Sequence, residues 1–348
     1  MMNTLDALCE AAAGFPHYSS EPTYHCTVTF ARQKAREAAA ARNRMLVMFK
    51  PECFRALDDL SPVPHRGQTQ LSEVLHAWDR LLRQTDSHVL AVCLFNGAWA
   101  TRGKLYATLY QTLAKVSMEG TSALHLGARQ ALQALLPTDK RALGGHQLLA
   151  RSTLSAKELQ VATDRAGTEK FGANLYLATL HLDGRDQHVI NGFSPYQQEH
   201  LERTPSTLGA CVVDTPLRWP DARGGLVGHI DPRLAAAGSL RRLLYEARLH
   251  SNPWDIAHNG AHISAGPFEA ISQISQIFPA AAAQELVAWD NDDLALIQRN
   301  PLVTRAQNNP APLYEVTELV ETNDAYSLFD DCRARGAIVL DTARPHRP

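Results

Sequence analysis

The sequence has few cysteines, and none has the spacing of a metal ligand pair or a redox pair. Its six cysteines are scattered along 348 residues without a Cys-x-x-Cys motif. Secreted domains that rely on disulfides are short and dense in cysteine, so these thiols are expected to be reduced. The cysteine content therefore predicts a cytoplasmic protein.

Long apolar runs, a signal peptide and a strong net charge are also absent. The longest apolar runs, such as His88–Phe95, are far shorter than the ~20 residues that span a bilayer. The first residues lack a basic segment followed by an apolar one, so no secretory signal is expected. A net charge of −2 gives no general attraction to nucleic acid or acidic lipid. We expect neither as a partner.

What is present is the composition of a globular protein, with 45% hydrophobic and 20% charged residues. Short apolar runs at Met45–Phe49, His88–Phe95 and Leu208–Val213 are typical of buried strands. Leu71–Leu82 has apolar residues at helical spacing, which predicts a helix. Later in the chain, Asp183-Gly184 between two alternating runs predicts a β-hairpin.

The most informative stretch runs from residue 252 to residue 278. His262 lies three residues after Asn259 and two before Ser264. Pro267 then begins a run whose apolar residues recur at steps of three and four, which predicts a helix. His262 is therefore expected in the turn between an extended segment and a helix N-terminus. Free N–H groups and the positive end of the helix dipole make such a turn suitable for phosphate.

Three motifs, taken in chain order, resemble the nucleoside diphosphate kinase family. They are Lys50-Pro51-Glu52 at the end of a strand, the segment from Gly228 to Arg241, and the segment from Asn259 to Ser264. The family has Lys-Pro-Asp, then Gly-x-Thr-(Asn/Asp)-Pro with Gly-(Thr/Ser)-(Ile/Leu)-Arg, and then Asn-x-x-His-x-Ser-Asp before a helix. Each motif is short, and their specificity comes from the shared order.

The resemblance implies an α+β fold of the ferredoxin-like (βαββαβ) type, an antiparallel sheet with helices on its faces. Residues 44–300 would form the kinase-like domain, between an N-terminal helical extension over 1–43 and a C-terminal extension over 301–348. The stretch from Lys50 to Gly228 is more than twice as long as in the family. This excess implies a large, mainly helical insertion at about 101–190.

The resemblance also implies roles for individual residues. His262 would be the nucleophile that takes a phosphoryl group from ATP or another nucleoside triphosphate and passes it on. Residues that would hold the nucleotide and its phosphates are Lys50, Arg223 (with Arg218 as substitute), Arg241, Asn259, Ser264, and Phe193 or Tyr196 as a base-stacking aromatic. An anchor for the next helix is an equal alternative for the two aromatics. Mg²⁺ would bridge the phosphates mainly through ligand oxygens and water.

Three positions depart from the family. Ile230 replaces a threonine that would touch a phosphate, and Ala265 replaces the aspartate after Ser264. Gln273 stands where the family has the glutamate that orients the histidine ring, and a carboxamide supplies no charge for that purpose. These changes predict a diverged phosphotransferase whose acceptor need not be a nucleoside diphosphate.

The same residues are compatible with other functions. Attack on the α-phosphate in the same pocket would make the protein a nucleotidyltransferase, and an idle His262 would leave a nucleotide-binding or assembly module. A homo-oligomer is possible, because the family forms tetramers and hexamers. A metal site made by His258 and His262 is disfavoured, because Gly260 and the extended context do not place both on one helical face.

Overall fold

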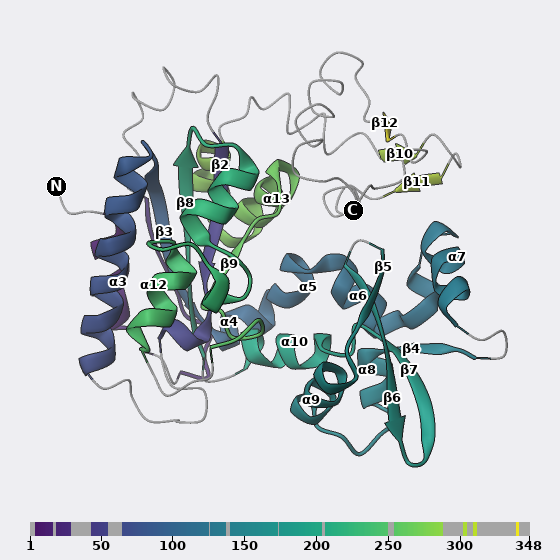
Figure 1. The fold of residues 1–348 in the computed structure, drawn as a ribbon. Coiled ribbons are helices and arrows are strands. Elements are labelled where there is room, and N and C mark those ends of the chain that lie inside the picture. Colours follow the sequence, from purple (N-terminus) through teal and green to yellow (C-terminus); the bar gives the residue numbers. More distant parts are fainter. Residues whose placement is uncertain are drawn as a thin grey trace. The chain divides into compact units, whose positions relative to one another are not determined.

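The computed structural model describes residues 4–16, 19–28, 43–54, 65–124, 126–136, 140–172, 174–203, 206–249, 254–287, 302–304, 309–311 and 339–340. The chain divides into two units, Met1–Trp99 with Thr204–Pro348 and Ala100–Arg203 (Figure 1). Residues 29–42 of the expected N-terminal helical extension lie outside the described residues, as does most of the extension expected over 301–348. No helix among the described residues has the length and apolar character needed to cross a membrane.

The first unit is built on a five-stranded sheet with the order β1-β3-β8-β2-β9, in which every neighbouring pair is antiparallel. Its strands are β1 (Tyr24–Val28), β2 (Asn43–Phe49), β3 (His88–Asn96), β8 (Thr207–Thr215) and β9 (Ala261–Ile263). The strands expected from the three apolar runs are confirmed as β2, β3 and β8. Every residue of β8 is buried, which explains its continuous apolar sequence. β1 differs from the expectation, because it is a strand in the segment predicted to be a helical extension.

Helices cover both faces of this sheet. The helices of the unit are α1 (Thr4–Ala13), α3 (His65–Gln84), α11 (Trp219–Asp221), α12 (Leu240–Ala247), α13 (Pro267–Ile277) and α14 (Ala280–Leu286), with short turns η2 (Pro51–Cys53), the π-helix η4 (Ala222–Val227) and η5 (Pro232–Leu234). Side chains alternate along β2. Phe49 meets Trp78 of α3 edge to face at 6.1 Å. Arg44, on the opposite face, donates to carbonyls at the end of α14.

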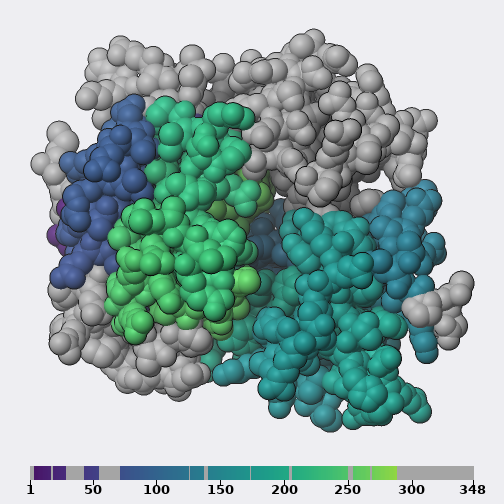
Figure 2. Space-filling view, viewed as in Figure 1, coloured from purple at the N-terminus to yellow at the C-terminus, as the bar shows by residue number. Residues whose placement is uncertain are grey.

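The crossover helices α3 and α12 pack against each other on the Phe49 face, and α3 also contacts η4 (Figure 1). In the space-filling view, α3 in blue and the green segment after β8 form one continuous surface (Figure 2). The indole N–H of Trp78 donates to the carbonyl oxygen of Leu226 at 2.8 Å. This bond ties η4 to the buried side of α3.

The second unit contains a four-stranded sheet, β4-β7-β6-β5, formed by β4 (Ala142–Gly144), β5 (Glu169–Gly172), β6 (Leu175–Leu182) and β7 (Arg185–Ile190). Its helices are α5 (Leu105–Leu109), α6 (Gln111–Glu119), η3 (Gly120–Ala123), α7 (Leu126–Leu135), α8 (Gly145–Leu149), α9 (Ala156–Ala166) and α10 (Ser194–Glu202). The expected hairpin is confirmed: Leu182 pairs with Arg185, and Asp183 and Gly184 both have positive φ. The strands β4 and β5 were not expected.

The second unit is inserted in the connection between β3 and β8. These strands are antiparallel neighbours, and their last pair is Asn96 with Thr207. The next pair is closed by the N–H of Gly97, which donates to the carbonyl of Ser206 at 2.8 Å. Because both ends of the insertion meet at one point, the sheet of the first unit is not interrupted. The short helix α4 (Gly97–Arg102) begins the connection. At the other end of the chain, β10 (Leu302–Thr304) pairs with β11 (Asn309–Ala311) and β12 (Val339–Leu340).

Candidate functional site

The pairing of β2 with β9 places Lys50 and His262 on one face of the sheet. His262 lies directly opposite Met48, and Lys50 follows Met48 by two residues. The backbone N–H of Lys50 donates to the carbonyl of Gly260 at 2.9 Å, which continues the pairing by one step. Since side chains alternate along a strand, the two side chains are diagonal neighbours on the same face.

Gly260 is required where it stands because of both its conformation and its surroundings. Its φ is +76°, and a Cβ there would lie 2.6 Å from Leu244 and 2.9 Å from Trp254. Its N–H donates to the carboxylate of Glu52 at 2.8 Å, and its carbonyl accepts from the thiol of Cys53 at 3.0 Å. The fully buried Glu52 therefore fixes the turn that leads into β9.

Lys50 is buried, and its ammonium group donates to the carbonyl of Ala257 at 3.2 Å. Burial lowers the pKa of Lys50, the carboxylate of Glu52 opposes that shift, and the guanidinium of Arg241 adds to it. The backbone N–H of Lys50 donates to the carbonyl of Gly260 and the guanidinium of Arg241 to that of Ala261, so the two basic residues bind adjacent residues of one segment.

Arg241 lies in the first turn of α12 and is also buried. Its guanidinium donates to the carbonyl of Gly228 at 2.7 Å and to that of Ala261 at 2.8 Å. Gly228 has φ +98°, and a Cβ there would lie 2.4 Å from the hydroxyl of Ser239. Arg241 therefore joins the loop after η4 to the strand that carries His262.

Arg223 projects from the π-helix η4 and is exposed. The i→i+5 bond of this helix runs from the N–H of Gly228 to the carbonyl of Arg223 at 2.8 Å. Single π-helical turns occur often at functional sites. The short helix α11 is followed directly by η4, which carries Arg223. Arg218 is the N-cap of α11.

His262 is the point on which these charges converge. Its side chain is 9% exposed, and its pKa is lowered to about 3, first by burial and then by Lys50, Arg241 and Arg223. A hydrogen bond from Gln273 opposes the shift. The ring is therefore neutral near pH 7, and the structure brings together the histidine and all three expected phosphate-binding cations.

The side chain of Gln273 determines how the ring is held. One amide hydrogen lies toward Glu269 Oε1, with Nε2 of Gln273 2.7 Å from that oxygen. The same Nε2 is 3.1 Å from Nε2 of His262. Because a carboxylate oxygen only accepts, the atom facing Glu269 is the amide nitrogen, and its second hydrogen donates to the ring. The neutral ring then carries its own proton on Nδ1.

Ser264 supports this arrangement and is not directed toward a ligand. It is fully buried, and its hydroxyl donates to Oε1 of Gln273 at 2.8 Å and accepts from the N–H of Leu46 at 3.2 Å. Its single hydrogen is used within the protein. The sequence-based expectation that Ser264 donates to phosphate is therefore replaced by a role in holding the carboxamide.

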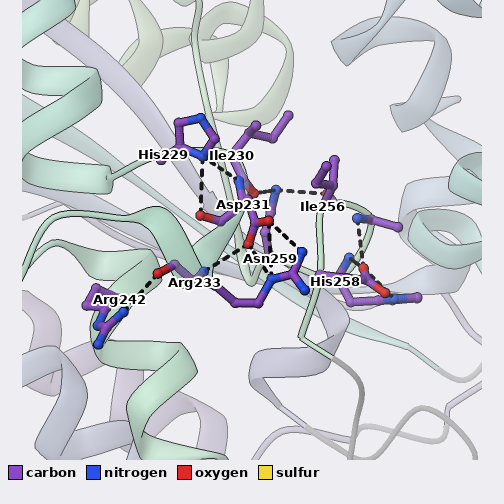
Figure 3. A network of polar contacts seen from close by, with 10 residues as sticks. His229, Ile230, Asp231, Arg233, Arg242, Ile256, His258 and Asn259 are labelled. Carbon is purple, nitrogen blue, oxygen red and sulfur yellow. Dashed lines mark hydrogen bonds and ion pairs between the residues drawn. The ribbon is translucent and has the colours of Figure 1, made fainter. Parts of the chain in front are cut away.

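Asn259 bridges two loops beside the site. Its amide nitrogen donates to the carbonyls of Ile230 and Ile256, each at 3.1 Å (Figure 3). Its carboxamide oxygen is buried and accepts no hydrogen bond from the described residues. Buried acceptors are usually satisfied, so this oxygen is suited to a hydroxyl or amine of a ligand. The side chains of Ile230 and Ile256 are more than half exposed on either loop.

The loop that contains Ile230 is held by charged side chains. Arg233 donates through Nε and Nη2 to both carboxylate oxygens of Asp231, at 2.9 and 2.6 Å (Figure 3). This contact lowers the pKa of Asp231 to about 2. Arg242 of α12 in turn donates to the carbonyl of Arg233 at 3.0 Å. Asp231, at the Asn/Asp position of the second motif, thus has a structural role in the loop.

Phe193 and Tyr196 belong to the second unit, so they are not part of the cluster that the first unit forms. The ring of Phe193 packs edge to face on Tyr176 at 5.7 Å, and that of Tyr196 stacks on His200 at 6.3 Å. Their expected contact with a nucleobase stays a prediction.

Carboxylates near His262 do not form a metal site. Within the described ranges, no group of three or more His, Cys, Asp or Glu residues is arranged to hold a metal ion. His258 is bound instead by Asp255, whose Oδ1 lies 3.2 Å from its Nδ1. A divalent ion at this site would have to be held mainly by oxygens of a ligand and by water.

Glu269 is the residue of the site that sequence reasoning missed. It lies 3.6 Å from Nε2 of His262 and bonds to Gln273, although no motif includes it. A signal was present, because residues four apart on a helix share a face and Glu269 precedes Gln273 by four. The charge that Gln273 itself lacks is therefore supplied one turn earlier in α13.

Comparisons with protein-family models, with curated proteins and with solved structures give no match to this chain. Membership of the nucleoside diphosphate kinase family is therefore not shown, and the resemblance depends on three short motifs. What the protein does has to be argued from the geometry around His262.

Proposed function

We propose that the first unit is a nucleoside-triphosphate-dependent phosphotransferase that resembles the nucleoside diphosphate kinases, with His262 as the phosphoryl carrier. Two contacts of β9 carry this proposal: Lys50 is the diagonal neighbour of His262 on the sheet, and the guanidinium of Arg241 donates to the carbonyl of Ala261 beside it. Lys50, Arg241 and Arg223 also lower the pKa of the buried ring. Like charges held together in a protein repel each other, and a bound polyphosphate would offset that repulsion. A neutral imidazole is also the form that can attack phosphorus.

The order of elements supports the same family type. In chain order, the first unit contains β2, α3, β3, β8, α12 and β9, which is the βαββαβ succession of ferredoxin-like folds. We infer that this succession is the core of the first unit, to which β1 adds an edge strand and the second unit an insertion between β3 and β8. The three motifs then lie at the end of β2, before α12 and on β9.

The proposed reaction has two displacements. A ring nitrogen of His262 attacks the γ-phosphorus of the triphosphate, forming a P–N bond while the P–O bond to the nucleoside diphosphate breaks. An oxygen of the acceptor then attacks the same phosphorus and breaks the P–N bond, which restores the ring. Lys50, Arg223 and Arg241 would bind the phosphate oxygens and stabilise the charge that develops on the leaving group.

Mg²⁺ would accompany the nucleotide, because the described residues offer it no cluster of protein ligands. When bound, the ion would neutralise phosphate charge. The carboxamide oxygen of Asn259, which accepts no hydrogen bond in the described part of the chain, would receive one from a sugar hydroxyl. The acceptor has no such identified contact, and it is defined here only as a nucleophilic oxygen.

One observation favours a second candidate, a nucleotide-binding module in which His262 is idle. Gln273 donates to Nε2 of the ring, so the ring proton is on Nδ1. Attack by Nδ1 requires that proton to be moved first. The arrangement of Gln273 thus supports binding without transfer, unless the ring can change its tautomer.

Labelled ATP distinguishes the candidates. Incubation with Mg²⁺ and γ-labelled ATP should leave an acid-labile, base-stable label on the protein, and His262→Gln should abolish it. Label that reaches product only from α-labelled ATP would establish nucleotidyl transfer. If neither label moves while ATP still raises the melting temperature, the protein is a binding module and the phosphotransferase proposal is wrong.

Arg223→Ala tests the cation cluster without disturbing the fold, because Arg223 is exposed. We expect the shift in melting temperature caused by ATP to shrink in this variant, since one of three phosphate contacts is lost. Arg83→Ala, which removes an exposed arginine of α3 paired with Asp79, is the control and should keep the full shift. Equal ATP-induced shifts in melting temperature in both variants would show that Arg223 does not contribute to the site.

A further inference from the structure

We propose that Glu269 is a positioning residue that sets the tautomer of His262 through the carboxamide of Gln273. The consequence for phosphoryl transfer rests on the proposed function, but the tautomer can be measured without it. The contacts involved are those of Glu269, Gln273, Ser264 and His262, which form one continuous hydrogen-bonded chain.

The carboxylate of Glu269 fixes which way the carboxamide faces. Nε2 of Gln273 is 2.7 Å from Glu269 Oε1. If the amide were rotated by 180°, its oxygen would take that place, and two acceptors would face each other. While Glu269 is ionised, the nitrogen therefore stays toward the carboxylate and toward the ring.

The opposite orientation is compatible with the contacts to His262, Ser264 and Leu46. A rotated Gln273 would offer its oxygen to an Nε2–H of the ring, and its nitrogen would face the hydroxyl of Ser264. That hydroxyl can then donate to the carbonyl of Leu46, which lies 3.4 Å away. Among these contacts, the one with the carboxylate of Glu269 opposes the rotation. The charge of Glu269 therefore holds the Gln273 amide in its observed orientation, which we call the tautomer lock.

Glu269 can also take part directly in the alternative tautomer. Its Oε1 lies 3.6 Å from Nε2 of His262, within the range of an ion pair and slightly beyond a hydrogen bond. If the Gln273 amide moved aside, the carboxylate would accept the Nε2–H and leave Nδ1 with a free lone pair. The resting arrangement therefore keeps a proton on Nδ1, which leaves that nitrogen unreactive. With the Gln273 amide displaced, Glu269 would instead stabilise the reactive tautomer.

The direct test is the protonation of each ring nitrogen in the full-length protein. Long-range ¹H–¹⁵N correlation spectra of ¹⁵N-histidine protein distinguish bare from protonated nitrogens, and His262→Gln identifies the signals among the 15 histidines. At neutral pH we expect wild type to have a bare Nε2 and a protonated Nδ1. A protonated Nε2 in wild type would overturn the proposal.

Two variants test the lock. Glu269→Gln removes the charge with the same shape, and should give Nε2–H as a large or major fraction. The exchange variant Glu269→Gln/Gln273→Glu places the carboxylate beside the ring, and should protonate Nε2 almost completely. Glu246→Gln removes an exposed carboxylate from α12 and should keep the wild-type tautomer. An unchanged tautomer in the exchange variant would contradict the proposed role, even if Glu269→Gln failed to fold.

The labelling assay separates this inference from the proposed function. If both hold, the exchange variant should accept label from γ-labelled ATP at least about tenfold faster than wild type, since a wrong tautomer costs about 10⁴-fold in a serine protease triad. A changed tautomer in the exchange variant with no label on any protein would support the role of Glu269 and contradict the proposed phosphotransferase function. Label on wild type with an unchanged tautomer in both variants would support the phosphotransferase function and contradict the role of Glu269.

Discussion

At the scale of single residues, the environment of His262 is set by partners that are distant in sequence. Lys50 directly follows β2, Arg223 comes from η4 and Arg241 from α12, and all three lower the pKa of the ring. Burial is the largest cause of that shift. The ring is thus kept neutral by its position in the fold, whatever its neighbours along the chain.

The neutral state of His262 predicts a pH dependence of stability. The ring pKa is about 3 in the folded protein against 6.5 for an ordinary histidine, so between these values the unfolded chain binds a proton that the folded chain does not. The free energy of unfolding therefore falls as pH decreases from 6.5 toward 3, by up to about 1.4 kcal/mol per pH unit. His262→Gln lacks this contribution and should gain stability relative to wild type as the pH falls.

Urea unfolding of both proteins at about pH 7, 5.5 and 4.5 measures this difference. A constant gap in the free energy of unfolding between wild type and variant at all three values would show that position 262 does not hold a buried neutral imidazole.

At the scale of elements, an ion pair joins the two central strands to the end of the helical layer. Arg44 of β2 lies opposite Asp214 of β8 in the register, and Nε of Arg44 is 3.3 Å from Asp214 Oδ1. The same guanidinium donates to the carbonyls of Glu285 and Leu286 at 2.7 and 2.9 Å. Arg44 therefore fixes α14, and the α13–α14 pair, against the face of the sheet that carries His262.

Arg44→Met should be strongly destabilising, by about 3–5 kcal/mol, because the buried carboxylate of Asp214 and the carbonyls of Glu285 and Leu286 would all lose the guanidinium of Arg44. The double variant Arg44→Met/Asp214→Leu should lose less than the single one, since it leaves no uncompensated charge. Denaturant unfolding gives both values. Arg83→Met, which breaks the exposed i,i+4 pair with Asp79, is the control and should cost below about 1 kcal/mol. A double variant no more stable than Arg44→Met would contradict the charge argument.

At the scale of the whole molecule, the second unit is an insertion whose two ends meet. Gly97 and Ser206 are hydrogen bonded, so β3 and β8 can be joined by a tight turn without changing their register. The cations of the candidate site and His262 all belong to the first unit. The first unit therefore contains the elements needed for its own sheet and all of the cations of the proposed phosphate site.

Replacing Ala100–Arg203 by a short glycine-containing turn should leave a folded first unit. Loop closure changes slowly with length, by about 0.6 kcal/mol per halving, and in favour of the shorter connection. We expect a cooperative thermal transition by circular dichroism and an ATP-induced shift like that of the full chain. A shortened protein that unfolds, or one that folds and ignores ATP, would show that the second unit completes the first.

Local patterns were sufficient for the strands that are apolar along their whole length, such as β8, and for the Asp183-Gly184 hairpin, whose turn chemistry is local. They failed for β1. Tyr24–Val28 is only partly buried, and it is a strand because it pairs with β3 and stacks Tyr24 on Phe95 and Trp99. Edge strands of this kind are defined by their partner, which periodicity does not contain.

For the candidate site, sequence reasoning found the residue types and the tertiary structure decided what they do. The order of the motifs was enough to nominate Lys50, Arg241 and His262, because motif spacing is a property of the chain. Motif order did not predict which group the hydroxyl of Ser264 donates to, which way the Gln273 amide faces, or that the carboxylate of Glu269 lies beside the ring. Hydrogen bonds and buried charges depend on which atoms meet across the fold, and that is settled only when β2, β9, α12 and α13 pack together.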